Sequence, residues 1–245
     1  MAIKLLLKIF FAVPVWFLQC FFLKKRIFIN NQILDLQTQA LLSLQSLQVN
    51  PLANPKAFGS ANDLRKALEG GREGLPLSIK PSCQIKIIDH LLQTEFGHLK
   101  LREYCPEGCS IQSPILYLHG GGYVVGSINT HDPWLKFFSA EISAKIFSLE
   151  YRLAPENKFP SSLLDANLAL EWLGERLQMP IEEISICGDS AGGHLAASLS
   201  THRAIHNLEL PHSQCLIYPM TDPSCNSKSQ LDFAEGFYLE KKTMI

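Results

Sequence analysis

The chain has 245 residues, 47% of them hydrophobic and 18% charged, and its formal net charge at pH 7 is −1. This composition is typical of a folded globular protein and excludes an intrinsically disordered one. No concentrated run of Lys and Arg supports binding to nucleic acid. None of the seven cysteines forms a C-x-x-C pair, so we expect reduced thiols, no disulfide scaffold and no metal site.

The N-terminal segment, residues 1–29, is strongly apolar. Gln19 is the only strongly polar side chain between residues 9 and 23, and the basic cluster Lys24-Lys25-Arg26 follows at once. This run is shorter than the about 20 apolar residues that a transmembrane helix needs. Because its aromatic side chains surround the helix instead of marking one face, we favour a membrane anchor. The alternative is an apolar cap helix of a cytoplasmic protein.

Residues 30–80 are predicted to form cap helices and a connector. Apolar residues at broadly helical spacing predict an amphipathic helix within residues 30–47. A second, short helix is expected over residues 61–68, ended by Gly70 and Gly71. This part is therefore expected to cover the core instead of forming it.

From residue 81 onwards, short apolar strands alternate with helices. Residues 84–92 and 99–104 predict two strands joined across Gly97. A helix over residues 161–177 carries an apolar stripe, with Asp165 on the opposite, polar face. Further strands are expected over residues 115–118, 145–149, 184–187 and 214–218. This alternation predicts an α/β fold, a mostly parallel sheet with helices on both faces.

A serine motif, Gly188-Asp189-Ser190-Ala191-Gly192, lies between the strand predicted over 184–187 and a helix of small residues. In a strand–turn–helix context, G-x-S-x-G is a sharp turn whose glycines relieve crowding and whose serine hydroxyl is exposed at the start of the helix. We therefore predict that Ser190 is a nucleophile. The alternative is a serine that only caps the helix.

A glycine motif, His119-Gly120-Gly121-Gly122-Tyr123, follows the strand predicted over 115–118. Consecutive glycines allow the backbone N–H groups of Gly121 and Gly122 to point at a ligand. With the N–H of Ala191, they would hold the oxyanion of a tetrahedral intermediate. A triple glycine alone is more often a flexible loop, but the two motifs together, in this order and each at a strand end, are a strong signal for a nucleophile with an oxyanion hole.

These motifs, with Tyr151-Arg152-Leu153-Ala154-Pro155-Glu156, resemble the hormone-sensitive-lipase-like branch of the α/β-hydrolases over residues 80–220. The resemblance implies the α/β-hydrolase fold and a carboxylesterase or lipase that acts on small acyl esters without a cofactor. It also assigns roles to individual residues: nucleophile to Ser190, oxyanion donors to Gly121, Gly122 and Ala191, and lining or bracing of the site to Tyr123 and Asp189.

The chain departs from this family after Ser190. The α/β-hydrolase triad follows the order Ser, then Asp or Glu, then His. We find neither a convincing acid at Asp222 nor a convincing base, and the candidates considered for the base are His194, His202, His206 and His212. We therefore expect a partial α/β-hydrolase domain over residues 81–245, incomplete at its C-terminus, with weak or absent hydrolysis.

The other histidines are expected to bind no metal. His119 is predicted to orient the glycine loop through a hydrogen bond, whereas His90, His98 and His131 are expected to be exposed. Cys187 is expected to be a buried small hydrophobe.

Two functions stay open from the sequence. The first is a serine ester hydrolase. The second is a non-catalytic ligand-binding protein, or a gene remnant, that keeps the pocket but lacks the base. The sequence does not predict the oligomeric state.

Overall fold

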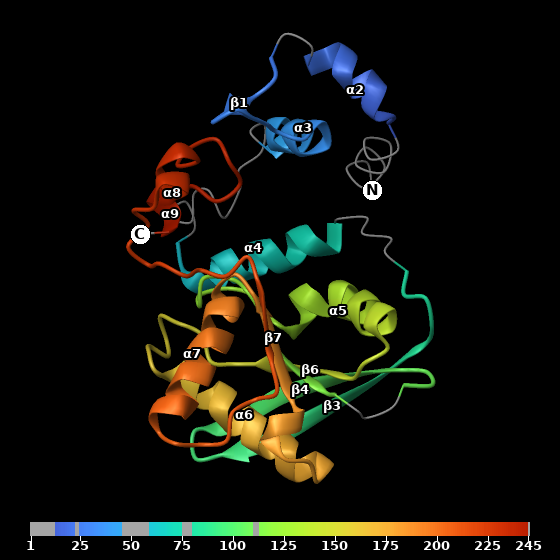
Figure 1. Ribbon diagram of the computed structural model, residues 1–245, viewed down its shortest axis with the longest axis vertical. Helices are drawn as coiled ribbons and strands as arrows, with labels where there is room; N and C mark the ends of the chain where they lie inside the picture. The colour runs from blue at the N-terminus through green and yellow to red at the C-terminus, as the bar shows by residue number, and fades with distance from the viewer. Residues whose placement is uncertain (1–12, 23–24, 46–58, 75–79, 110–112, 245) are drawn as a thin grey trace. The chain divides into compact units, whose positions relative to one another are not determined.

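A computed structural model describes residues 13–22, 25–45, 59–74, 80–109 and 113–244 of the chain (Figure 1). The chain forms two compact units. The sheet unit contains Leu77–Thr221, and the terminal unit combines Met1–Pro76 with Asp222–Ile245. The serine motif and the glycine motif both lie in the sheet unit.

The sheet unit is built on six strands: β3 (Ile85–Thr94), β4 (Gly97–Pro106), β5 (Ile115–Leu118), β6 (Ile146–Glu150), β7 (Ser185–Asp189) and β8 (Gln214–Ile217). Their order across the sheet is β3-β4-β6-β5-β7-β8. Strands β6, β5, β7 and β8 run parallel, whereas β3 and β4 form a hairpin that pairs antiparallel to β6. The predicted α/β fold with a mostly parallel sheet is confirmed.

Three helices cover this sheet: α5 (Ile128–Ile142), α6 (Ser161–Leu177) and α7 (Ala191–Ile205), with the short 3-10 helix η2 (Ile181–Glu183) before β7. Because side chains alternate along a strand, β5 contributes to two cores. Leu116 and Leu118 pack with residues of α6 and α7. Tyr117, between them, packs on the other face with Leu135 of α5. Helices therefore cover both faces of the sheet, as predicted (Figure 1).

The sequence predicts Asp165 on the polar face of α6, but this prediction is wrong. The side chain of Asp165 is only 1% exposed. The guanidinium of Arg152 explains this burial, since its Nη2 lies 2.7 Å from Asp165 Oδ1 and its Nε lies 3.0 Å from both carboxylate oxygens. The backbone N–H of Arg152 also donates to Asp165 Oδ2 at 2.8 Å. A carboxylate that is both paired and hydrogen-bonded tolerates burial.

The terminal unit contains short elements from both ends of the chain: α2 (Val15–Phe22), β1 (Phe28–Ile29), β2 (Gln32–Ile33), α3 (Leu36–Gln45), α4 (Ala61–Gly74), α8 (Lys228–Asp232) and α9 (Lys241–Met244). Helices α2 and α3 share a small core of Leu18, Leu36 and Ala40. The helix expected over residues 61–68 is present, but α4 continues past the two glycines that were expected to end it.

The amphipathic helix expected from residue 30 begins only at Leu36. Asn30 and Asn31 have positive φ angles of 50° and 60°, which form the tight turn between β1 and β2. Asp35 then caps α3, because its Oδ1 accepts the backbone N–H of Thr38 at 2.8 Å. The two asparagines and this aspartate are the local signals for a hairpin followed by a helix start.

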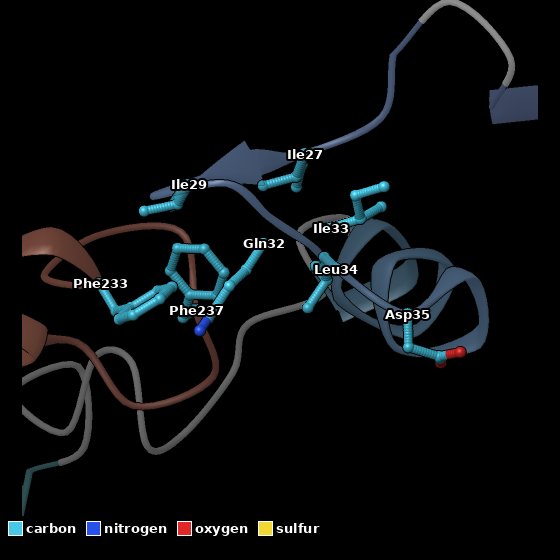
Figure 2. A pocket seen from close by; sticks show the side chains of 8 residues that line it. All are labelled: Ile27, Ile29, Gln32, Ile33, Leu34, Asp35, Phe233 and Phe237. Carbon is cyan, nitrogen blue, oxygen red and sulfur yellow. The ribbon is translucent and has the colours of Figure 1, made fainter.

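An apolar hollow of about 130 Å³ lies within the terminal unit (Figure 2). Hairpin residues such as Ile29 line one part of it, and Phe233 and Phe237 from the C-terminal segment line another. The rings of Phe233 and Phe237 meet edge to face at 5.1 Å, and Asn30 Nδ2 donates to Asp232 Oδ2. Segments from the two ends of the chain therefore pack together in this unit.

Among the helices in the described residues, none is long and apolar enough to span a membrane. Helix α2 covers part of the predicted anchor. Residues 1–12 and 23–24 of that segment lie outside the described residues.

Candidate active site

Ser190 lies at the sharp turn between β7 and α7, where its φ and ψ are 53° and −118°. A positive φ is uncommon for a residue with a side chain. The turn is held to β8, because Ser190 N–H donates to Ile217 O at 2.9 Å. The partly exposed Ser190 thus has the strand–turn–helix context that the motif predicts.

The two outer glycines of this motif lie where a side chain has no room. A Cβ on Gly192 would lie 2.0 Å from Leu118 O and 2.6 Å from His119 O. A Cβ on Gly188 would lie 2.4 Å from the backbone of Gly192. These close approaches bring the start of α7 directly against the end of β5, where the glycine motif begins.

The glycine motif forms a tight turn after β5. Gly121 has a φ of 131°, and Gly122 has a φ of 60°. The carbonyl oxygen of Gly121 accepts the backbone N–H groups of Val124 (3.1 Å) and Val125 (3.0 Å). These two hydrogen bonds close the turn within the glycine motif.

Asp189 joins the two motifs. Its Oδ1 accepts the backbone N–H of Gly120 at 2.9 Å and the hydroxyl of Tyr117 at 2.8 Å, and His131 Nε2 lies 3.2 Å from the same oxygen. Burial by itself would raise the pKa of Asp189, but the hydrogen bonds from His131, Tyr117 and Gly120 outweigh burial and lower this pKa. Asp189 is therefore a buried carboxylate at neutral pH.

His119 contributes to the shape of the loop through its own backbone and ring. Its Nδ1 lies 2.9 Å from Gly120 O, and its carbonyl oxygen accepts the hydroxyl of Tyr151 at 2.6 Å. The two rings stack with their centroids 4.2 Å apart. These contacts are of the kind expected for a residue that orients the glycine loop.

The sequence predicts that His131 is exposed, but this prediction is wrong. His131 is only 6% exposed, and its ring contacts Asp189. Its Nδ1 lies 2.9 Å from Thr130 Oγ1. It lies in the first turn of α5, which begins with a reciprocal cap between Ser127 and Thr130. The sequence contains this capping signal, Ser127-x-x-Thr130, which marks the start of the helix but not the residues that face the sheet. His90 is also largely buried, whereas His98 is exposed as expected.

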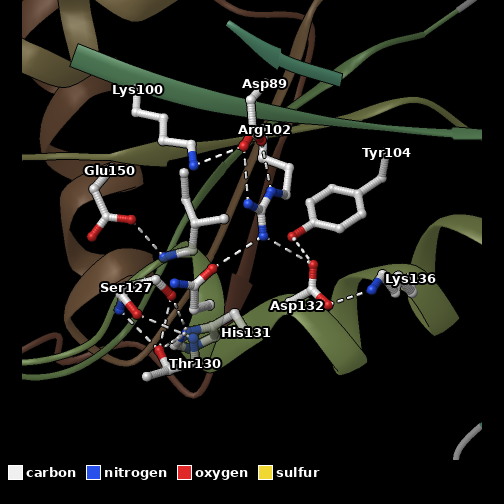
Figure 3. A network of polar contacts seen from close by, with 12 residues as sticks. Asp89, Lys100, Arg102, Tyr104, Ser127, Thr130, His131, Asp132, Lys136 and Glu150 are labelled. Atoms are coloured by element: carbon white, nitrogen blue, oxygen red, sulfur yellow. Dashed lines mark hydrogen bonds and ion pairs between the residues drawn. The ribbon is translucent and has the colours of Figure 1, made fainter. Parts of the chain in front are cut away.

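A polar network fixes the start of α5 to the sheet (Figure 3). Arg102 of β4 donates to Asp89 of β3 (Nε–Oδ1, 2.7 Å) and to Asp132 of α5 (Nη1–Oδ1, 3.2 Å). The hydrogen bond and charge of Arg102 hold the pKa of Asp89 far below its usual range. Glu150 of β6 accepts the first backbone N–H of α5 at 2.8 Å. The helix that carries His131 is therefore held at two places.

Tyr123 ends the glycine motif and contacts His194 of α7, with its hydroxyl 2.6 Å from Nδ1. Burial lowers the pKa of His194 and raises the pKa of Tyr123, so both groups are neutral at pH 7. His194 is therefore engaged with the glycine motif.

Within the described part of the chain, Ser190 Oγ has no hydrogen bond to a histidine ring. The rings of His202 and His206 lie with their centroids 4.2 Å apart near the end of α7, tilted by 39°, and His212 Nδ1 lies 3.1 Å from Glu182 O. Asp222 accepts the backbone N–H of Ser224 in a local turn. The same described residues contain no group of three or more side chains suited to a metal ion.

Comparison with known proteins identifies the family. Residues 115–245, more than half of the chain, match the family of the α/β-hydrolase fold. An ethyl acetate hydrolase from Pseudomonas putida is 37% identical over 173 residues, which cover 67% of this chain and 54% of that protein. Mouse hormone-sensitive lipase is 32% identical over 139 residues, which cover 56% of this chain and 18% of that protein.

A solved structure agrees with these matches. The esterase of Pyrobaculum calidifontis superposes with a TM-score of 0.72 at 27% identity, over 84% of this chain and 66% of that chain. This chain spans about half the length of the ethyl acetate hydrolase. The fold, the two motifs and these relatives together show that the chain belongs to the α/β-hydrolase family, in its hormone-sensitive-lipase-like branch.

Proposed function

We propose that this chain has the site of a carboxylic ester hydrolase, with Ser190 as the nucleophile that attacks the ester carbonyl carbon. The observation that carries the proposal is the hydrogen bond from Gly120 N–H to Asp189 Oδ1, at 2.9 Å. This bond places the glycine motif beside the residue that precedes the serine. The proposed nucleophile and the proposed backbone donors would therefore act at one place, as acyl transfer requires.

The proposed oxyanion donors are the backbone N–H groups of Gly121, Gly122 and Ala191. Ala191 is the first residue of α7, where N–H groups lack partners within the helix and carry a partial positive charge. Such donors stabilise the negative oxygen of the tetrahedral intermediate, and the loss of one typically costs about 10²–10³ in kcat. No metal and no organic cofactor takes part in this proposal.

The proposed substrate is a small acyl ester, a class suggested by the name of the ethyl acetate hydrolase relative. Serine at its free pKa is a weak nucleophile without a general base. The described residues place no histidine ring in a hydrogen bond with Ser190, and His194 is bound to Tyr123. We therefore propose that the 245-residue chain hydrolyses such esters weakly or not at all. The same observation favours, as a second candidate, a non-catalytic protein that binds an ester.

Hydrolysis of p-nitrophenyl acetate by the full chain is expected to be slow, and its residual part is expected to disappear in Ser190→Ala. Enzymes that lack a triad member keep about 10³–10⁴-fold catalysis over water, so a faint rate agrees with the proposal. The matched control is Ser198→Ala, which removes a partly exposed hydroxyl from α7, the helix that follows Ser190. Fast turnover that depends on Ser190 would contradict the expectation that the chain lacks a general base for this serine. Equal rates with and without the Ser190 hydroxyl would contradict the proposal that Ser190 is the nucleophile.

We also propose that the N-terminal segment associates with membranes. In α2, Val15, Trp16 and Phe17 are 46%, 65% and 43% exposed, and exposed aromatic side chains suit a shallow position in the lipid interface. The full chain is expected to float with phospholipid vesicles in a density gradient, and Trp16→Glu with Phe17→Glu is expected to reduce the floating fraction. Phe28→Glu is the control, because Phe28 is 63% exposed but lies outside α2. Equal flotation of both variants would contradict the role of α2.

A further inference from the structure

The turn that follows β4 brings two cysteines into contact. Cys105 is the penultimate residue of β4, and its Sγ lies 3.5 Å from Sγ of Cys109. Both residues are partly exposed. The S–S bond of a disulfide is about 2.05 Å long. A small rotation of the two side chains would therefore bring the sulfur atoms to bonding distance.

The backbone holds this turn independently of the sulfur atoms. Cys109 N–H donates to Pro106 O at 3.2 Å, and Glu107 N–H donates to Gln84 O at 2.9 Å. Gly108 has a φ of 76°, with open space around the position of a Cβ. The chain therefore returns Cys109 to the end of β4 while both thiols are reduced.

The surroundings of the pair include a positive charge. Lys145 Nζ forms an ion pair with Glu103 Oε1 at 3.1 Å, and its ammonium also interacts with both cysteines. This charge favours the thiolate of Cys109, but burial and the hydrogen bond between the two sulfur atoms outweigh it and raise the pKa of Cys109. Thiolate is the attacking form in disulfide exchange, so reactions of this pair are expected to accelerate as the pH rises.

We propose that Cys105 and Cys109 form a reversible dithiol–disulfide pair that is oxidised by low-molecular-weight disulfides. The thiolate of one cysteine attacks a sulfur of glutathione disulfide, breaks its S–S bond and releases one glutathione thiolate. The second cysteine, as thiolate, then attacks the protein sulfur of the mixed disulfide and releases the other glutathione. The dithiol loses two electrons and two protons, and glutathione disulfide is reduced to two molecules of glutathione.

The proposed pair differs from the other cysteines of the described chain. Cys187 and Cys215 lie opposite each other on β7 and β8, but Cys187 is 1% exposed, and burial raises the pKa of its thiol. Cys225 is also buried. Cys83 is partly exposed, which makes it a matched control for thiol access.

The test is to equilibrate the full chain in glutathione buffers of increasing oxidised fraction, block free thiols with N-ethylmaleimide and map the peptides by mass spectrometry. We expect a peptide with an internal Cys105–Cys109 disulfide, formed faster at pH 8.5 than at pH 7 and reversed by dithiothreitol. In Cys109→Ser, Cys105 is expected to stop at the mixed disulfide with glutathione, whereas Cys83→Ser keeps the internal disulfide.

The mapping of the unmodified chain decides the proposal even if a variant does not fold. It is overturned if both thiols stay free in the most oxidising buffer, or if each carries its own glutathione. It is also overturned if Cys105 or Cys109 pairs with another cysteine in preference to its neighbour.

Discussion

Replacing Asp189 with alanine is expected to lower the free energy of unfolding by about 3 kcal/mol or more, because several buried donors lose their acceptor together. Three donors would lose their acceptor at once: Gly120 N–H, the Tyr117 hydroxyl and His131. A buried donor without a partner costs about 1–3 kcal/mol. Urea unfolding at pH 7, followed by far-UV circular dichroism, measures the loss.

Asp189→Asn separates charge from hydrogen bonding, because an amide oxygen still accepts from Gly120 and Tyr117. The folded-state pKa of Asp189 is lowered, so its contribution to stability is present above the unfolded pKa of about 3.9 and is lost as the pH falls below that value. The stability of the asparagine variant should therefore fall less steeply than that of the unmodified chain below about pH 4. Identical slopes for the two proteins would contradict the lowered pKa.

Gly192→Ala is expected to destabilise the chain by about 3 kcal/mol or more, at the upper end of overpacking effects. The added methyl group would lie 2.0 Å from Leu118 O, and backbone atoms cannot rotate out of its way as the end of a side chain can. Either α7 or the end of β5 must move. Thermal unfolding should show a lower midpoint and a broader transition.

Gly122→Ala is the matched control for this prediction. A Cβ on Gly122 would have no atom within 4 Å, so the only penalty comes from its φ of 60°. A left-handed conformation costs an alanine about 1–2 kcal/mol. If the two variants lost the same stability, the close contact of Gly192 with the end of β5 would not be the reason for the glycine.

The strands and the two motifs were predictable because their signals are local. Short apolar runs mark β5, β6, β7 and β8, and β5 has its predicted bounds. The glycines of the serine motif are required by backbone contacts that recur wherever this turn occurs.

Buried polar residues were not predictable in the same way. Asp165 has the composition of a surface residue, and only its pairing with Arg152, from a different element, explains its burial. His131 contacts Asp189, which lies far from it in the sequence, and helical periodicity does not reveal such a contact. Burial of a charged or titratable group depends on a partner supplied by the tertiary fold.

The glycine motif is attached at two points, one at each of its ends, to the segment that joins the end of β7 to α7. Asp189 holds Gly120 on one side, and His194 holds Tyr123 on the other. A single attachment would leave the loop free to pivot, but two attachments remove this rotation. The entropy of fixing the proposed donors is therefore lost during folding and not when an ester arrives, so a bound carbonyl oxygen would meet dipoles that are already aligned.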